Sequence, residues 1–184
     1  MRYTAFLILG ILLIVLQAQI PLFWGALTIY GFEPSLLTTL LVFLGVAEQP
    51  LGLLAGIAFV LGYTLDIVGG APLGIYSLTS VTTLVLARAT GVRIVIQGGL
   101  LRALLAGAFA GLQTMLVAVL IAIFGKNPYV PGQIMRHVPG ASVSTALTAP
   151  LVYWLAERVQ GWVTALLEGP KTDTIKEKKK GSRR

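Results

Sequence analysis

Long apolar runs recur along the 184-residue chain, and each of them ends at charged residues, glycine or proline. A membrane hydrocarbon core of about 30 Å needs around 20 helical residues for one crossing, so runs of this kind predict membrane-spanning helices. The pattern predicts about six, at residues 3–20, 34–47, 51–68, 72–87, 98–124 and 140–155. The run at 34–47 is the shortest of the first three, and its length does not decide whether it crosses fully.

A different pattern follows the sixth run. One apolar stripe at helical spacing is formed by Val159, Trp162, Val163, Leu166 and Leu167. It predicts either a helix over 159–168 that lies in the membrane surface or an extension of the sixth span below the bilayer. We therefore expect one transmembrane helical domain, residues 1–168, followed by a disordered basic tail at 169–184.

Composition points to lipid as the surrounding solvent. Charged residues make up 11% of the chain and hydrophobic residues 56%, whereas soluble domains carry about 25% charged residues. The chain has no cysteine, which excludes thiol nucleophiles, disulfides and thiolate metal sites.

The net charge of +7 is concentrated in the tail, because seven of the fourteen Lys and Arg residues lie in the last fourteen positions. These residues are Lys171, Lys176, Lys178, Lys179, Lys180, Arg183 and Arg184. Basic residues directly after a transmembrane helix favour contact with anionic cytoplasmic lipid or with an acidic partner, and argue against nucleic acid. Since basic loops stay inside, the tail predicts that both termini are cytoplasmic and that only Lys126 and Arg136 face outward.

Asp66 is the only acid within the apolar part of any predicted span, so it should have a specific partner. Gly69 and Gly70 permit a tight reversal after it, and Pro72 suits the first position of the next helix. The amides at the start of that helix, near Gly74 and Ile75, could then hold the carboxylate. Arg136 or Lys126 is the alternative partner. We interpret Asp66, Gly69, Gly70, Pro72 and Gly74 as a structural clamp or a partner-binding site; a proton or ligand site is the rival hypothesis.

Small residues recur at four-residue spacing, as in the pairs Gly52 and Gly56, and Gly107 and Gly111. In lipid, small residues let helix backbones approach closely. We expect these glycines to be helix-packing positions, and we favour packing within the bundle over contact with a partner.

Little catalytic equipment is present. His137 is the only histidine, and the sequence has no metal-binding HExxH pattern, no glycine-rich phosphate loop and no Ser/His/Asp set. The sequence therefore predicts a protein that is not an enzyme and has neither a metal site nor a cofactor.

The stretch from Gln17 to Leu78 resembles the rod shape-determining protein MreD family of bacteria. The resemblance rests on a first helix ending in Leu16-Gln17, on Gly31-Phe32-Glu33-Pro34 leading into an aliphatic helix, and on two motifs further along. Those two are Gly52-Leu53-Leu54-Ala55-Gly56 and Leu65-Asp66-Ile67-Val68-Gly69-Gly70-Ala71-Pro72-Leu73-Gly74.

The resemblance implies a non-enzymatic, multi-pass scaffold of the cell-elongation and peptidoglycan-synthesis complex in the bacterial inner membrane. Its partners would be MreC and, through it, MreB, RodA and a class B penicillin-binding protein. The family is similar in fold to the substrate-binding component of energy-coupling-factor transporters. A vitamin-binding component of that kind is the alternative function. Such components typically carry an AxxxA pattern on the first helix, which Ala5 and Ala18 do not form.

Overall fold

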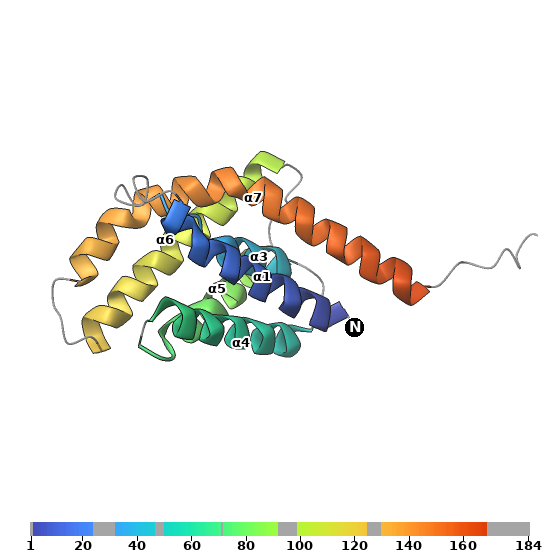
Figure 1. Cartoon of the computed structure of the whole chain (residues 1–184), viewed down its shortest axis with the longest axis horizontal. Helices are drawn as coiled ribbons and strands as arrows, with labels where there is room; N and C mark the ends of the chain where they lie inside the picture. Colours follow the sequence, from blue (N-terminus) through green and yellow to red (C-terminus); the bar gives the residue numbers. More distant parts are fainter. Residues whose placement is uncertain are drawn as a thin grey trace, which may run out of the picture.

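The computed structural model describes residues 2–23, 32–46, 50–70, 72–91, 99–124 and 130–168. Within these ranges the chain forms helices and no strand: α1 (Arg2–Phe23), α3 (Leu36–Val46), α4 (Leu51–Gly69), α5 (Ile75–Gly91), α6 (Gly99–Phe124) and α7 (Val130–Glu168) (Figure 1). The prediction of an all-α chain is confirmed for this part of the protein.

Three helices are long and apolar enough to cross a membrane, with candidate spans at Tyr3–Ile20, Leu51–Gly69 and Gly99–Phe124. Their bounds lie within two residues of the predicted runs 3–20, 51–68 and 98–124. The other three crossings stay predictions, because α3 and α5 are shorter than 18 residues and α7 is less apolar.

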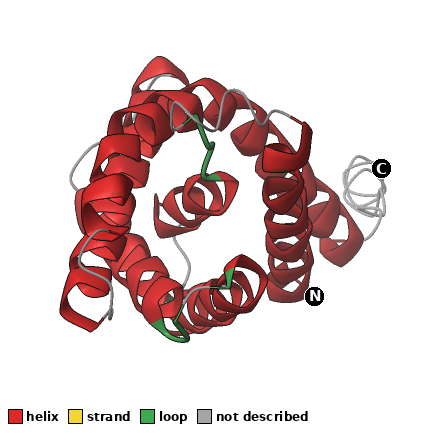
Figure 2. Ribbon diagram, turned by 60° about the vertical axis from the view of Figure 1, so that its left-hand side comes forward, coloured by secondary structure: helices red, strands yellow, loops and turns green. Residues whose placement is uncertain are grey.

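The short helix α3 lies at the centre of the bundle. Figure 2 shows it enclosed by the other helices, and it contacts α1, α4, α5, α6 and α7. Nine of its eleven residues are buried. At 1.5 Å per residue the helix is only about 16 Å long, so it fills roughly half the depth of a bundle built to cross a bilayer.

The main core forms around α3, mostly from leucine and isoleucine. It combines Leu37, Leu40 and Leu41 of α3 with Ile14 of α1, and α7 contributes Val152 and Ala156. On the outside, large apolar side chains such as Leu147, Leu151 and Phe124 are exposed. An apolar exterior over a packed interior suits a bundle surrounded by lipid.

The last helix is longer than the sequence indicates. The predicted span at 140–155 and the segment 159–168 belong to one continuous helix, α7, which begins at Val130. The segment 159–168 therefore extends the preceding helix rather than starting a new one. Pro139 and Pro150 lie inside α7, and Figure 1 shows the helix arching over the bundle, as expected where prolines remove backbone hydrogen bonds.

Candidate functional site

The carboxylate of Asp66 lies at the N-terminal end of α5, where it accepts four hydrogen bonds. Oδ2 accepts from the amide of Gly74 at 2.9 Å, and from the amide and hydroxyl of Ser77 at 3.2 and 2.9 Å. Oδ1 accepts from the amide of Tyr76 at 2.8 Å. Asp66 is 1% exposed. The free amides of a helix N-terminus thus satisfy a charge that would otherwise be costly to bury.

The turn that brings Asp66 to α5 is built from glycine. Gly70 ends α4 with a φ of 64°, and Gly74 has a φ of 99°. Both angles are in the left-handed region that glycine adopts at no steric cost. Gly69 is exposed at the end of α4, and a Cβ added there would meet no described atom within 4 Å.

Pro72 is not the first residue of α5, so that prediction is wrong. The helix begins at Ile75, and the carbonyl of Pro72 accepts a hydrogen bond from the amide of Ile75 at 3.4 Å. Because the Ile75 amide is used in this way, the donors to Asp66 come from Gly74, Tyr76 and Ser77. The alternative partner Arg136 makes no ion pair with a residue that the structure describes, and Lys126 lies outside the described residues.

The backbones of α4 and α5 touch just below this turn. A Cβ added at Gly62 would lie 2.6 Å from both Cα of Ser77 and the carbonyl oxygen of Tyr76. No side chain fits in that space, so glycine at this position allows Asp66 and the start of α5 to approach.

A second set of polar contacts holds the start of α3. The Oε1 atom of Gln17, on α1, accepts from the amides of Leu36 at 3.0 Å and Leu37 at 3.4 Å. The amide of Ser35 donates to Oγ1 of Thr145, on α7, at 2.9 Å. Side chains from two other helices therefore satisfy the first amides of α3.

The polar contacts continue into the bundle. The Thr38 hydroxyl donates to Oε1 of Gln113 at 2.6 Å, and the Ser35 hydroxyl is bonded to that of Thr38. Since the single Thr38 proton goes to Gln113, Ser35 is the donor in the second bond. Thr38 and Gln113 are buried, so this chain links α3 to α6 away from water.

A cavity opens at the N-terminal end of α3, beside residues of both sets of polar contacts. It has two adjoining lobes of about 350 and 250 Å³, which share Gln17, Glu33, Leu65 and Tyr76. We call it the α3 cavity. Six parts of the chain line it: α1, the segment before α3, α4, α5, α6 and α7. It exists because α3 is too short to fill the centre of the bundle along its whole length.

The predicted packing glycines fall into two groups. A Cβ on Gly107 would lie 2.7 Å from the carbonyl oxygen of Ser142, and one on Gly111 would meet the Ser142 hydroxyl, so this pair packs against α7. At Gly52 and Gly56, both exposed, an added Cβ meets no described atom within 4 Å. The preference for packing within the bundle therefore fails for Gly52 and Gly56, as far as the described residues reach.

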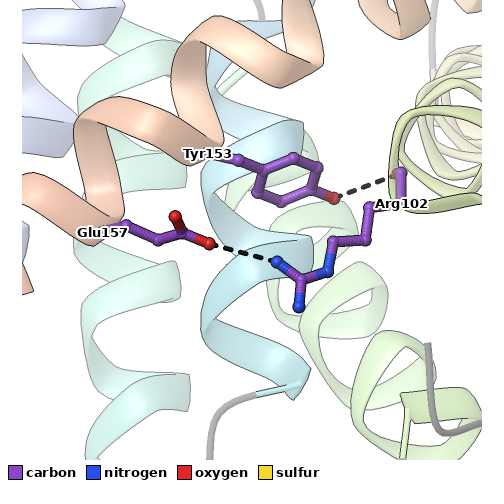
Figure 3. A network of polar contacts seen from close by, with 3 residues as sticks. All are labelled: Arg102, Tyr153 and Glu157. Carbon is purple, nitrogen blue, oxygen red and sulfur yellow. Dashed lines mark hydrogen bonds and ion pairs between the residues drawn. The ribbon is translucent and has the colours of Figure 1, made fainter. Parts of the chain in front are cut away.

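Polar contacts also join α6 and α7 at the end of the bundle remote from the α3 cavity. Figure 3 shows Arg102 facing two residues of α7: its guanidinium lies 3.1 Å from the Glu157 carboxylate, and its carbonyl accepts from the Tyr153 hydroxyl at 3.3 Å. The Arg158 guanidinium lies 5.4 Å from the ring of Trp154. The basic tail residues predicted to contact the membrane surface or a partner lie outside the described residues.

No role was predicted from the sequence for Gln17, Thr38, Gln113 or Tyr76. The available signal was polarity: an amide side chain inside an apolar run must find a partner in a bundle. Among the described residues, no group of three His, Asp or Glu side chains could hold a metal ion. The polar side chains described above instead hold the starts of α3 and α5, and a cavity with polar residues at its edge lies beside them.

Comparison with known proteins gives a match to a family model. The family model described as rod shape-determining protein MreD matches residues 1–160. No curated protein and no solved structure gives a significant match.

Proposed function

The chain belongs to the rod shape-determining protein MreD family, and on that premise we propose that it is a non-enzymatic scaffold of the bacterial cell-elongation complex. The family membership makes it a membrane protein that determines rod shape. The family match, over 160 of the 184 residues, is the observation that carries the proposal. The scaffold would act by lateral helix contacts in the bilayer that position its partners.

The outer face of α4 offers a surface for such contacts. Gly52 and Gly56 lie on it with open space beside them, and Phe59 and Tyr63 are exposed further along the same helix with stacked rings. In lipid, close backbone approach and aromatic contact can hold two helices together without hydrophobic drive. We infer that a partner helix packs along this face.

The proposed partners are MreC and, through it, MreB, RodA and a class B penicillin-binding protein. Membrane lipid would contact the basic tail, in which each Lys or Arg contributes roughly 1 kcal/mol of attraction to an anionic surface. Removal of Lys171–Arg184 should leave insertion intact and weaken these contacts.

The proposed location is the inner membrane, with several crossings and both termini cytoplasmic. In support, Arg88, Arg102 and Arg158 lie toward the end of the bundle remote from the α3 cavity, and in the sequence the basic tail follows α7, which carries Arg158. Basic residues collect on the cytoplasmic side of membrane proteins. The cavity would then open toward the outside.

A vitamin-binding substrate component of an energy-coupling-factor transporter, with the fold of such components, remains the alternative. The α3 cavity favours it, because the larger lobe of about 350 Å³ falls in the range of about 300–1,000 Å³ for ligand pockets. Tight binding of a vitamin by the purified protein would support this alternative.

A complementation experiment tests the scaffold. The chain is expressed in a rod-shaped bacterium that lacks its own MreD, and rod shape and co-purification of MreC are scored. Wild type should restore both, and the double variant Gly52→Leu/Gly56→Leu should fold but lose both. Gly99→Leu is the matched control, because an added Cβ there also meets no described atom within 4 Å.

The outcomes separate two claims. Failure of stably inserted wild type to restore rod shape would contradict the scaffold function. A double variant that works like wild type would contradict only the assignment of the α4 face.

A further inference from the structure

The α3 cavity has a carboxylate in its lining. Among the described residues around its two lobes, Glu33 is the only Asp, Glu, Lys or Arg. Its side chain is exposed and makes no ion pair with any residue in the described ranges. A carboxylate at the edge of a low-dielectric cavity attracts a cation more strongly than it would in water.

Two nearby acceptors, the Asp66 carboxylate and the Gln17 side-chain oxygen, are already used and do not compete for that cation. The Asp66 carboxylate is buried under four hydrogen bonds, and Oε1 of Gln17 accepts from the amides of α3. The Tyr76 hydroxyl makes no hydrogen bond with the described residues, so it is available as a second acceptor.

Apolar side chains form part of the walls of both lobes, beside the polar Ser35, Thr114 and His137 of the smaller one. Leu65 and Val68 line the larger lobe, and Val117, Ile134 and Ala141 line the smaller one. A cavity with an apolar wall and one charged edge suits a ligand that has an apolar stem and one charged end.

We propose that the α3 cavity binds an ammonium or guanidinium group carried on an aliphatic stem, with the cation at Glu33 and the stem against Leu65. Two sources supply this chemistry: a basic side chain from a partner's segment at the membrane surface, or a free aliphatic amine. The proposal goes beyond the scaffold function, since purified protein with added probe tests it in the absence of any elongation partner.

The test uses the full chain in phosphatidylcholine nanodiscs, with histidine labelled by ¹³C. His137 is the only histidine and lines the smaller lobe, so its ring gives one signal that reports on occupancy. The probes are n-butylamine, Nα-acetyl-lysine methylamide and n-butanol, which has the same stem without the charge. Both amines should shift the signal saturably, and n-butanol should leave it unchanged.

Variants link the signal to the carboxylate. Glu33→Gln should weaken binding about fivefold, the size expected for an ion pair partly screened by solvent. Glu33→Asp keeps the charge and should stay close to wild type. Glu157→Gln removes an exposed acid at the opposite end of the bundle and should have no effect.

The two amines identify the source. Tighter binding of the lysine derivative indicates a partner's side chain, whereas tighter binding of n-butylamine indicates a free amine. An equal shift with n-butanol, or unchanged affinity in Glu33→Gln, would overturn the proposal while leaving the scaffold function untouched.

Discussion

The backbone amide of Tyr76 donates to Oδ1 of Asp66 at 2.8 Å, and this bond joins the first turn of α5 to the last turns of α4. Alone, a carboxylate near the C-terminus of α4 is unfavourable, because that end of a helix carries partial negative charge. The hydrogen bonds that Asp66 accepts at the start of α5 outweigh this unfavourable interaction. We therefore propose that Asp66 clamps the two helices together.

Asp66→Asn tests the clamp at constant volume. The amide keeps one acceptor but places an NH₂ group against amides that can only donate, so we expect a loss of about 2 kcal/mol or more in unfolding free energy. Thermal unfolding of the purified protein in detergent measures it. Glu157→Gln, which breaks an exposed ion pair, should cost less than about 1 kcal/mol. Equal stability of the two variants would argue against a clamp.

Gly62→Ala tests the close approach of α4 and α5. The new Cβ would lie 2.6 Å from Cα of Ser77, so the helices must separate, at a cost of about 1–3 kcal/mol. Gly56→Ala, on the same helix with open space, should be neutral or gain up to about 1 kcal/mol from helix propensity. Denaturant unfolding of both variants gives the comparison; a harmless Gly62→Ala would show that the contact can relax.

Thr38→Val tests the buried link between α3 and α6. The change keeps the side-chain shape but leaves Oε1 of Gln113 without its 2.6 Å donor, at an expected cost of about 1–3 kcal/mol. Thr82→Val is the control, since the Thr82 hydroxyl bonds only within its own helix, to the carbonyl of Leu78. The Thr82→Val change should shift the unfolding midpoint only slightly. If both variants lose a similar amount of stability, the bond between Thr38 and Gln113 has no special role.

Single cysteines test the orientation, because the chain has no cysteine of its own. Gly132→Cys and Gly161→Cys both introduce a thiol where an added Cβ meets no described atom within 4 Å. A membrane-impermeant maleimide should label position 132 in intact cells, and position 161 only after the membrane is opened. The reverse labelling pattern would overturn the topology with both termini in the cytoplasm.

The region around Asp66 could be predicted because its partners are local. Only eight to eleven residues separate the carboxylate from its donors, and the intervening glycines allow few paths for the chain. The sequence did not locate the start of α5. Proline at position 72 fits the first residue of a helix, but it fits the turn that the chain adopts equally well.

Contacts between segments far apart in the chain could not be predicted from the sequence. Ser35 and Thr145 are 110 residues apart, and Thr38 and Gln113 are 75 apart. Four-residue spacing identified Gly107 and Gly52 alike, but it cannot tell an inward face from an outward one. The length of α7 was missed for a related reason: the sixth apolar run begins at 140, whereas α7 begins at Val130 and packs against α6.

The central place of α3 constrains how the protein is made. Residues 36–46 leave the ribosome early, yet the cluster that buries Leu37 and Leu40 also includes Val152 and Ala156. An eleven-residue segment is too short to be retained in a bilayer on its own hydrophobicity. Its enclosure is therefore completed only when synthesis is almost finished, which makes α7 a requirement for the stable insertion of α3.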